Sequence, residues 1–310
     1  MTYEQDTGAL QPPPPGPALG DVVPEQGRMG GLAVRCEGVV HLYRTFAGHD
    51  VVALQGVDLE IAAGERVAFL GPSGSGKSTL LTLLGGIQRP SAGRIFLGDS
   101  EISRMGERYL ARIRARRVST MLQGATRNLL PYATAAQNIS FARMGQASRG
   151  GGDLLGEGDL LRRVGLGELE HQVVSTMSGG QRQRLALACA VSTGPQLLLA
   201  DEPTSQLSHE DRDHVLELMH AIGDEFGTTI VVVTHQPEVA ATFARTVTMK
   251  GGRVGAEGRE GTEYVVVGTD GVLHLPSHLA GQWPPGTLVR IESDGGRLVL
   301  SRPDATEGLA

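Results

Sequence analysis

The sequence has little of what marks secreted or membrane-spanning chains. Its 310 residues include only two cysteines, too few for a disulfide framework, which fits a reducing cytoplasm. No apolar run approaches the roughly 20 residues of a membrane helix, and the N-terminus lacks the basic-then-apolar pattern of a signal peptide. The formal net charge of −6 attracts no polyanion, so we expect no nucleic-acid partner. Any role at a membrane is therefore expected to be peripheral.

Composition along the chain predicts three parts. Residues 1–30 hold a proline run, Pro12 to Pro15, among small and polar residues that cannot bury enough surface to order themselves, and we expect a disordered tail. Residues 31–258 are expected to form one α/β domain. Residues 259–310 contain four short strand-like runs and predict a small β unit. The runs are 264–267, 271–275, 287–291 and 297–300, and they are separated by glycine and proline turns at 270–271, 284–286 and 294–296.

Four short apolar runs without alternation predict strands that are covered on both faces, and hence a mostly parallel sheet with crossover helices. These runs are 66–70, 118–122, 196–200 and 229–233. Between the second and third lies a long segment, about 124–192, that predicts a helical subdomain with a glycine-rich loop. A residue that could bind a ligand through its backbone or side chain directly follows each run: Gly71, Gln123, Asp201 and Thr234-His235. Since ligands bind beyond the carboxyl ends of parallel strands, we expect these residues to share one site.

The first of these features is a phosphate-binding motif, GxxxxGK[ST], between a strand and a helix. Its glycines allow backbone N–H groups to surround phosphate oxygens at a helix N-terminus, and Lys77 adds a charge near the β- and γ-phosphates of ATP. Ser78 is expected to place its hydroxyl on Mg²⁺. The motif consists of Gly71, Pro72, Ser73, Gly74, Ser75, Gly76, Lys77, Ser78 and Thr79.

The adjacent acids Asp201 and Glu202 follow an apolar strand. Together with the phosphate motif, they predict a metal contact from Asp201 and a general base, Glu202, that polarises the attacking water. Without that motif, the pair would read equally well as acids in the first turn of a helix.

Met177-Ser178-Gly179-Gly180-Gln181, ahead of the acidic pair, resembles the signature sequence of the ATP-binding-cassette (ABC) family, usually LSGGQ. The resemblance implies an ATPase with a P-loop fold, in which Ser178, Gly179, Gly180 and Gln181 bind the γ-phosphate held by the opposite protomer of a homodimer. The residues themselves predict that Ser178 caps a helix from about Gln181 to Ser192.

Three further positions match the family. Tyr43 resembles the aromatic residue that stacks on adenine, Gln123 the glutamine that touches Mg²⁺ and water, and His235 the histidine that contacts the γ-phosphate. The stretch Asn128-Leu-Leu-Pro131 resembles the corresponding stretch of ATPases that are paired with macrolide-exporter, lipoprotein-release and division-type permeases. This likeness implies a membrane permease partner, a position at the cytoplasmic face of the membrane, and contact with the permease between Gln123 and about Arg143.

Two regions leave alternatives open. Ser208 stands where the family usually has an aspartate that orients groups across the dimer, so a regulatory ATPase that controls an extracytoplasmic activity without transport is a rival interpretation. A soluble ABC ATPase acting on ribosomes or DNA is another. The C-terminal unit resembles the swapped-hairpin fold of AbrB-type regulators. It is expected to serve dimerisation or regulation, with a nucleotide-gated transcription factor as a further alternative.

Overall fold

The computed structural model describes residues 30–44, 49–144, 155–259, 262–265, 283, 287, 289–294 and 297–301. Residues 1–29 of the predicted tail lie outside the described residues. So do the expected strand at 271–275 and Gly150 to Gly152 of the glycine-rich loop.

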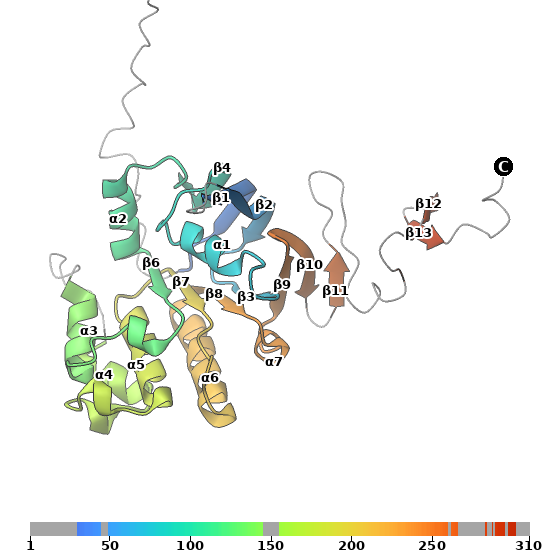
Figure 1. Cartoon of the computed structure of the whole chain (residues 1–310). Coiled ribbons are helices and arrows are strands. Elements are labelled where there is room, and N and C mark those ends of the chain that lie inside the picture. Colours follow the sequence, from blue (N-terminus) through green and yellow to red (C-terminus); the bar gives the residue numbers. More distant parts are fainter. Residues whose placement is uncertain are drawn as a thin grey trace, which may run out of the picture.

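The main sheet has the strand order β11-β10-β9-β3-β8-β7-β6 (Figure 1). Strands β6, β7, β8, β3 and β9 run parallel to one another, whereas β10 pairs antiparallel with β9, and β11 pairs antiparallel with β10 at the edge. The four strands predicted from apolar runs are therefore confirmed. The sheet consists of β3 (Arg66–Leu70), β6 (Val118–Met121), β7 (Leu197–Asp201), β8 (Thr229–Thr234), β9 (Arg245–Lys250), β10 (Arg253–Arg259) and β11 (Thr262–Val265).

Both faces of this sheet are buried, which explains why the middle positions of its central strands β3, β7 and β8 are all apolar. Along β7, Leu197 and Leu199 pack into one hydrophobic cluster, and Leu198 and Ala200 into the cluster on the opposite face. Strand β8 alternates in the same way between the two clusters.

One face is covered by α1 (Lys77–Leu84) and a second, antiparallel sheet, ordered β2-β1-β4-β5. The register between β1 and β2 shifts three times, beginning between Cys36 and Val39, which interrupts any strict alternation. The sequence therefore did not predict this sheet. Its strands are β1 (Val34–Arg44), β2 (Asp50–Ile61), β4 (Ala92–Leu97) and β5 (Ser100–Glu101).

The predicted helical subdomain is present between β6 and β7. Figure 1 shows α3, α4 and α5 gathered beyond these strands, away from α1. Helix α6 (His209–Phe226) follows β7. Its Val215, Leu216 and Met219 pack into the hydrophobic cluster that contains Leu198 and Ala200 of β7. No helix in the described part of the chain is long and apolar enough to cross a membrane. The other helices are α2 (Glu107–Arg116), η1 (Ala125–Arg127), α3 (Ala135–Arg143), α4 (Glu157–Arg163), η3 (Gly167–Leu169), η4 (Val174–Thr176), α5 (Gly179–Val191) and α7 (Pro237–Ala240).

Arg245 ties the two sheets together. Its buried guanidinium on β9 donates to the carbonyl oxygen of Glu60 on β2 at 2.7 Å, and it pairs with Glu65 at 3.0 Å and with Glu257 on β10 at 2.8 Å. Burial disfavours the charge on Arg245, but the hydrogen bonds and charges of the two glutamates raise its pKa overall.

Two of the C-terminal strands start at other residues than expected, whereas the last one starts at Arg297 as expected. The strand expected at Tyr264–Val267 is β11, Thr262–Val265, and it extends the main sheet. The strand expected at 287–291 is β12 (Arg290–Asp294), which pairs with β13 (Arg297–Ser301) on either side of the turn expected at Asp294–Gly296. A separate unit from residue 259 and its likeness to AbrB stay predictions.

Both cysteines, Cys36 and Cys189, are free and buried. Burial raises the pKa of each thiol to about 12.

Candidate active site

The phosphate motif, residues 71–79, forms the turn between β3 and α1 and the start of that helix. Gly76 is the N-cap of α1, with φ at 95°, a left-handed conformation that favours glycine. A Cβ atom there would also lie 2.6 Å from the Ala53 carbonyl oxygen and 2.7 Å from the Leu54 side chain. Glycine is therefore required on two counts. The turn leaves the N-terminal N–H groups of α1 available to an anion.

Lys77 lies inside this turn. Its ammonium donates to the carbonyl oxygens of Gly71 at 2.7 Å and Pro72 at 2.9 Å, and to Ser75 Oγ at 3.3 Å. Burial lowers the pKa of Lys77, although the charges of Glu202 and Asp201 act against this shift. The loop thus holds one buried cation beside two carboxylates.

Ser78 and Asp201 face one another across the site. The Ser78 hydroxyl donates to Asp201 Oδ1 at 3.1 Å, from the first turn of α1 to the end of β7. Burial raises the pKa of Asp201, partly offset by the hydrogen bond from Ser78. A hydroxyl and a carboxylate at this separation are ligands that suit Mg²⁺. The residues present therefore fit the predicted metal.

Glu202 has an unusual backbone. Its φ is 49°, and its N–H donates to the Val233 carbonyl of the neighbouring strand at 2.9 Å. Its Oε1 lies 2.7 Å from His235 Nδ1, while Oε2 is buried and has no hydrogen-bond partner. A left-handed conformation at a non-glycine residue costs about 1–3 kcal/mol and concentrates at functional sites. The free Oε2 marks where a further polar group fits.

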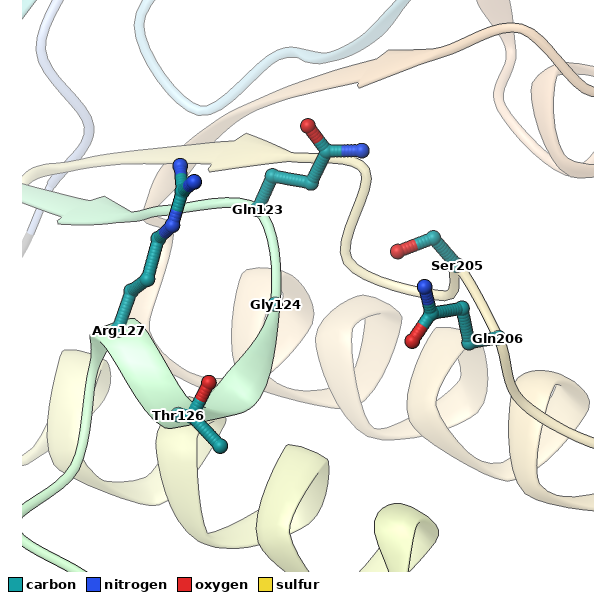
Figure 2. A pocket seen from close by; sticks show the side chains of 6 residues that line it. All are labelled: Gln123, Gly124, Thr126, Arg127, Ser205 and Gln206. Carbon is teal, nitrogen blue, oxygen red and sulfur yellow. The ribbon is translucent and has the colours of Figure 1, made fainter.

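Gln123 follows β6 and lines a cavity of about 290 Å³ with Gly124, Thr126, Arg127, Ser205 and Gln206. Figure 2 shows the Ser205 hydroxyl and the Gln206 amide on the side facing Gln123. The Arg127 charge lowers the pKa of Asp201, although burial raises it overall. The sequence analysis did not identify Arg127 as a site residue. Its position four residues after Gln123, in the same loop, could have indicated that it lies near the site.

Tyr43 lies near the phosphate motif, at the end of β1. Its hydroxyl donates to Gln88 Oε1 at 3.0 Å and reaches Thr79 Oγ1 at 3.3 Å. With 37% of the residue exposed, a flat base could stack on the ring.

The segment 178–181, here called the signature segment, opens α5. Ser178 caps the helix in a reciprocal box: its hydroxyl accepts from the Gln181 N–H at 3.2 Å, and Gln181 Oε1 accepts from the Ser178 N–H at 2.8 Å. The predicted cap is confirmed, and α5 begins two residues earlier than expected. Among the described residues, no hydrogen bond joins this segment to residues 71–79.

These features define a class of protein. A glycine-rich turn between a parallel strand and a helix, with a lysine, a hydroxyl and paired carboxylates at adjoining strand ends, is a P-loop nucleotide-hydrolase site. The family model described as "ABC transporter" matches residues 54–205. The lipoprotein-releasing system ATP-binding protein LolD of Anaeromyxobacter dehalogenans is 40% identical over 206 residues, 66% of this chain and 85% of that protein. The chain therefore belongs to the ABC transporter family, whose cassettes bind and hydrolyse ATP.

Two further relatives agree with this assignment. The macrolide export ATP-binding/permease protein MacB of Rhodopirellula baltica is 40% identical over 217 residues, 68% of this chain but 31% of that longer protein. The dimeric, post-hydrolysis structure of the ATP-binding cassette MJ0796 with ADP and Pi has a TM-score of 0.65 and 30% identity. The region that aligns covers 73% of this chain and 98% of the MJ0796 chain.

Proposed function

We propose that this cassette works as an ATP-driven homodimer that energises a separate membrane permease from the cytoplasmic face. The observation that carries the proposal is the position of the signature segment. Ser178 and Gly179 are exposed at a capped helix N-terminus, with no hydrogen bond to the phosphate motif of the same protomer within the described chain. Such a helix start suits an anion brought by another molecule. The dimeric structure of MJ0796 supports a second cassette as that molecule.

Within one protomer, the family resemblance assigns the proposed roles, and the contacts support them. Residues 71–79 hold the phosphates, Tyr43 stacks on the base, and Ser78 and Asp201, with Gln123, hold Mg²⁺. The metal would supply charge neutralisation for the phosphates when bound.

Glu202 is the proposed general base. His235 Nδ1–H donates to Oε1 and fixes the carboxylate, so the partnerless Oε2 is left to accept a proton from water. The water oxygen then bonds to the γ-phosphorus, the bond from that phosphorus to the β–γ bridging oxygen breaks, and ADP and phosphate leave. Lys77 balances the charge throughout.

The permease contact is proposed on the segment 123–143. Two aromatic side chains there face solvent, with 77% of Tyr132 and 56% of Phe141 exposed. Exposed aromatic groups of this size suit a protein interface rather than solvent. The relatives point the same way, since MacB carries its permease in the same chain, as its name states.

Glu202→Gln tests the dimer and the base together. The amide retains the size of the carboxylate but cannot accept the proton, so the variant should bind ATP, hydrolyse it poorly and accumulate as a dimer, measured by light scattering after gel filtration. Glu210→Gln changes an exposed acid in the first turn of α6 and should behave like wild type. A Glu202→Gln protein that stays monomeric with ATP and magnesium would contradict the dimer, and one with unchanged turnover would contradict the base.

A further inference from the structure

The two glycines of the signature segment have different surroundings. Gly179 is exposed, and a Cβ atom built on it would meet nothing within 4 Å. Gly180 is buried, and a Cβ atom there would lie no more than 2.5 Å from the carboxylate of Asp211, well inside van der Waals contact. The closely packed neighbour of Gly180 is thus a side chain of its own protomer.

The Asp211 carboxylate is held in this place by Ser208, the N-cap of α6. The Ser208 hydroxyl accepts from the Asp211 N–H at 3.1 Å and lies 3.1 Å from Asp211 Oδ2, to which it can donate. A short side chain fixed at both its backbone and its carboxylate cannot swing away from an added methyl group at low cost. Ser208 itself has no carboxylate, but Asp211, three residues later in the same helix turn, provides one.

A second contact joins the same two elements. The side-chain amide of Gln183, buried on α5, donates to the carbonyl oxygen of Pro203. Pro203 directly follows Glu202, and Ser208 ends the loop that begins there. Helix α5 therefore contacts the chain on both sides of the 203–208 loop. Gln183 hydrogen-bonds to Pro203 at the start of the loop, and Gly180 packs against Asp211 in the first turn of α6, just after the loop ends.

We propose that Asp211 is a positioning residue that fixes the signature segment to the loop following the general base. The inference rests on the proposed function, in which Glu202 serves one ATP and the signature segment of the same protomer serves the other. Through Asp211, a displacement of the loop at one ATP site would then displace the signature segment at the other. Gly180 is required because it makes room for this carboxylate, rather than for close approach of a phosphate.

Enlarging the side chain at position 180 while shortening the one at position 211 distinguishes these two reasons for a glycine at position 180. Gly180 has no left-handed φ, and alanine is a better helix former than glycine, so Gly180→Ala creates only the steric conflict. The single variant should lower kcat about tenfold to a hundredfold, the effect of an ångström-scale displacement near a reacting group. Gly180→Ala with Asp211→Ala removes the conflict and should return kcat to that of Asp211→Ala alone. The affinity of the monomer for a fluorescent ATP analogue should not change in any of these variants.

Asp211→Asn retains an oxygen that accepts from Ser208 and should keep more activity than Asp211→Ala. Asp213→Ala is the matched control, since its carboxylate is 59% exposed and pairs with Arg212 on the same helix. Melting temperatures in the absence of nucleotide test the contact itself: Gly180→Ala should melt lower than the double variant. An Asp211→Ala protein as active as wild type, a double variant less active than Asp211→Ala alone, or a Gly180→Ala protein as active as wild type would overturn the inference. If wild type neither dimerises with ATP nor hydrolyses it, the proposed function fails instead.

Discussion

His235 Nδ1 lies 2.7 Å from Glu202 Oε1, across the ends of the adjacent parallel strands β8 and β7. The imidazole is about half exposed, whereas the glutamate side chain is 10% exposed. The histidine is therefore the outer partner of a buried carboxylate. This arrangement predicts that His235 acts on the orientation of the base more than on nucleotide affinity.

His235→Ala should lower kcat about a hundredfold, the lower end of what a positioned proton-transfer group contributes, while the Kd for ATP stays close to wild type. Steady-state hydrolysis and equilibrium nucleotide binding measure the two quantities. His171→Ala, at an exposed loop position, is the control. A matching loss of affinity would show that His235 binds the ground state instead.

Lys77→Ala should weaken ATP binding about tenfold to a hundredfold, because a hydrogen-bonded charge contributes about 1.5–3 kcal/mol. Lys250, the only other lysine of the chain, is exposed at the end of β9, so Lys250→Ala provides a control for loss of a lysine. Titration calorimetry with Mg-ATP measures the change. Tight binding in Lys77→Ala would rule out the assigned phosphate site.

Glu257 predicts a dependence of stability on pH. Burial opposes its ionisation, but the hydrogen bonds and charges of Arg245 and Arg259 outweigh burial and lower its pKa below the ordinary 4.5. A lowered carboxyl pKa in the folded state means that its stabilisation is present above pH 4.5 and disappears as the pH falls through the lowered value.

Glu257→Gln should therefore lose about 1.5–3 kcal/mol of unfolding free energy at neutral pH, and less below pH 4. Urea unfolding at a series of pH values provides the comparison. Glu238→Gln, at an exposed acid on α7, should follow wild type throughout. An equal loss at every pH would mean that ionisation of Glu257 does not stabilise the fold.

Tyr132→Ser should weaken association with the permease about tenfold or more, since central aromatic residues of an interface contribute about 2 kcal/mol or more. Cosedimentation with membrane vesicles from the cells that produce the chain measures association, and ATP hydrolysis in solution should be unchanged. Tyr264→Ser, on the edge strand β11 and 53% exposed before the change, is the control. Equal cosedimentation of both variants would place the contact elsewhere.

Much of the nucleotide site could be predicted because its signals are local. A buried parallel strand has a mostly apolar run without strict alternation, so the ends of β3, β6, β7 and β8 could be located. The residues that follow these strands could be located with them. The Ser178 cap could likewise be predicted, since a capping box needs only residues three positions apart.

What the sequence did not reveal depends on contacts between distant segments. The register shifts between β1 and β2 break the alternation that identifies an antiparallel sheet. The contact of Asp211 with Gly180 joins residues 31 positions apart on two helices, and no spacing rule links them. The pairing of β11 with β10 is likewise not visible in composition, which places residues 262–265 in the predicted C-terminal unit.

The burial of both cysteines has a practical consequence. Thiols that titrate near pH 12 and lie within the two hydrophobic clusters are protonated and shielded from maleimides at neutral pH. A single cysteine introduced at exposed His171, outside the proposed ATP site, should therefore accept a fluorophore selectively in the otherwise native chain. Distance changes between two labelled copies could then be followed in real time during turnover.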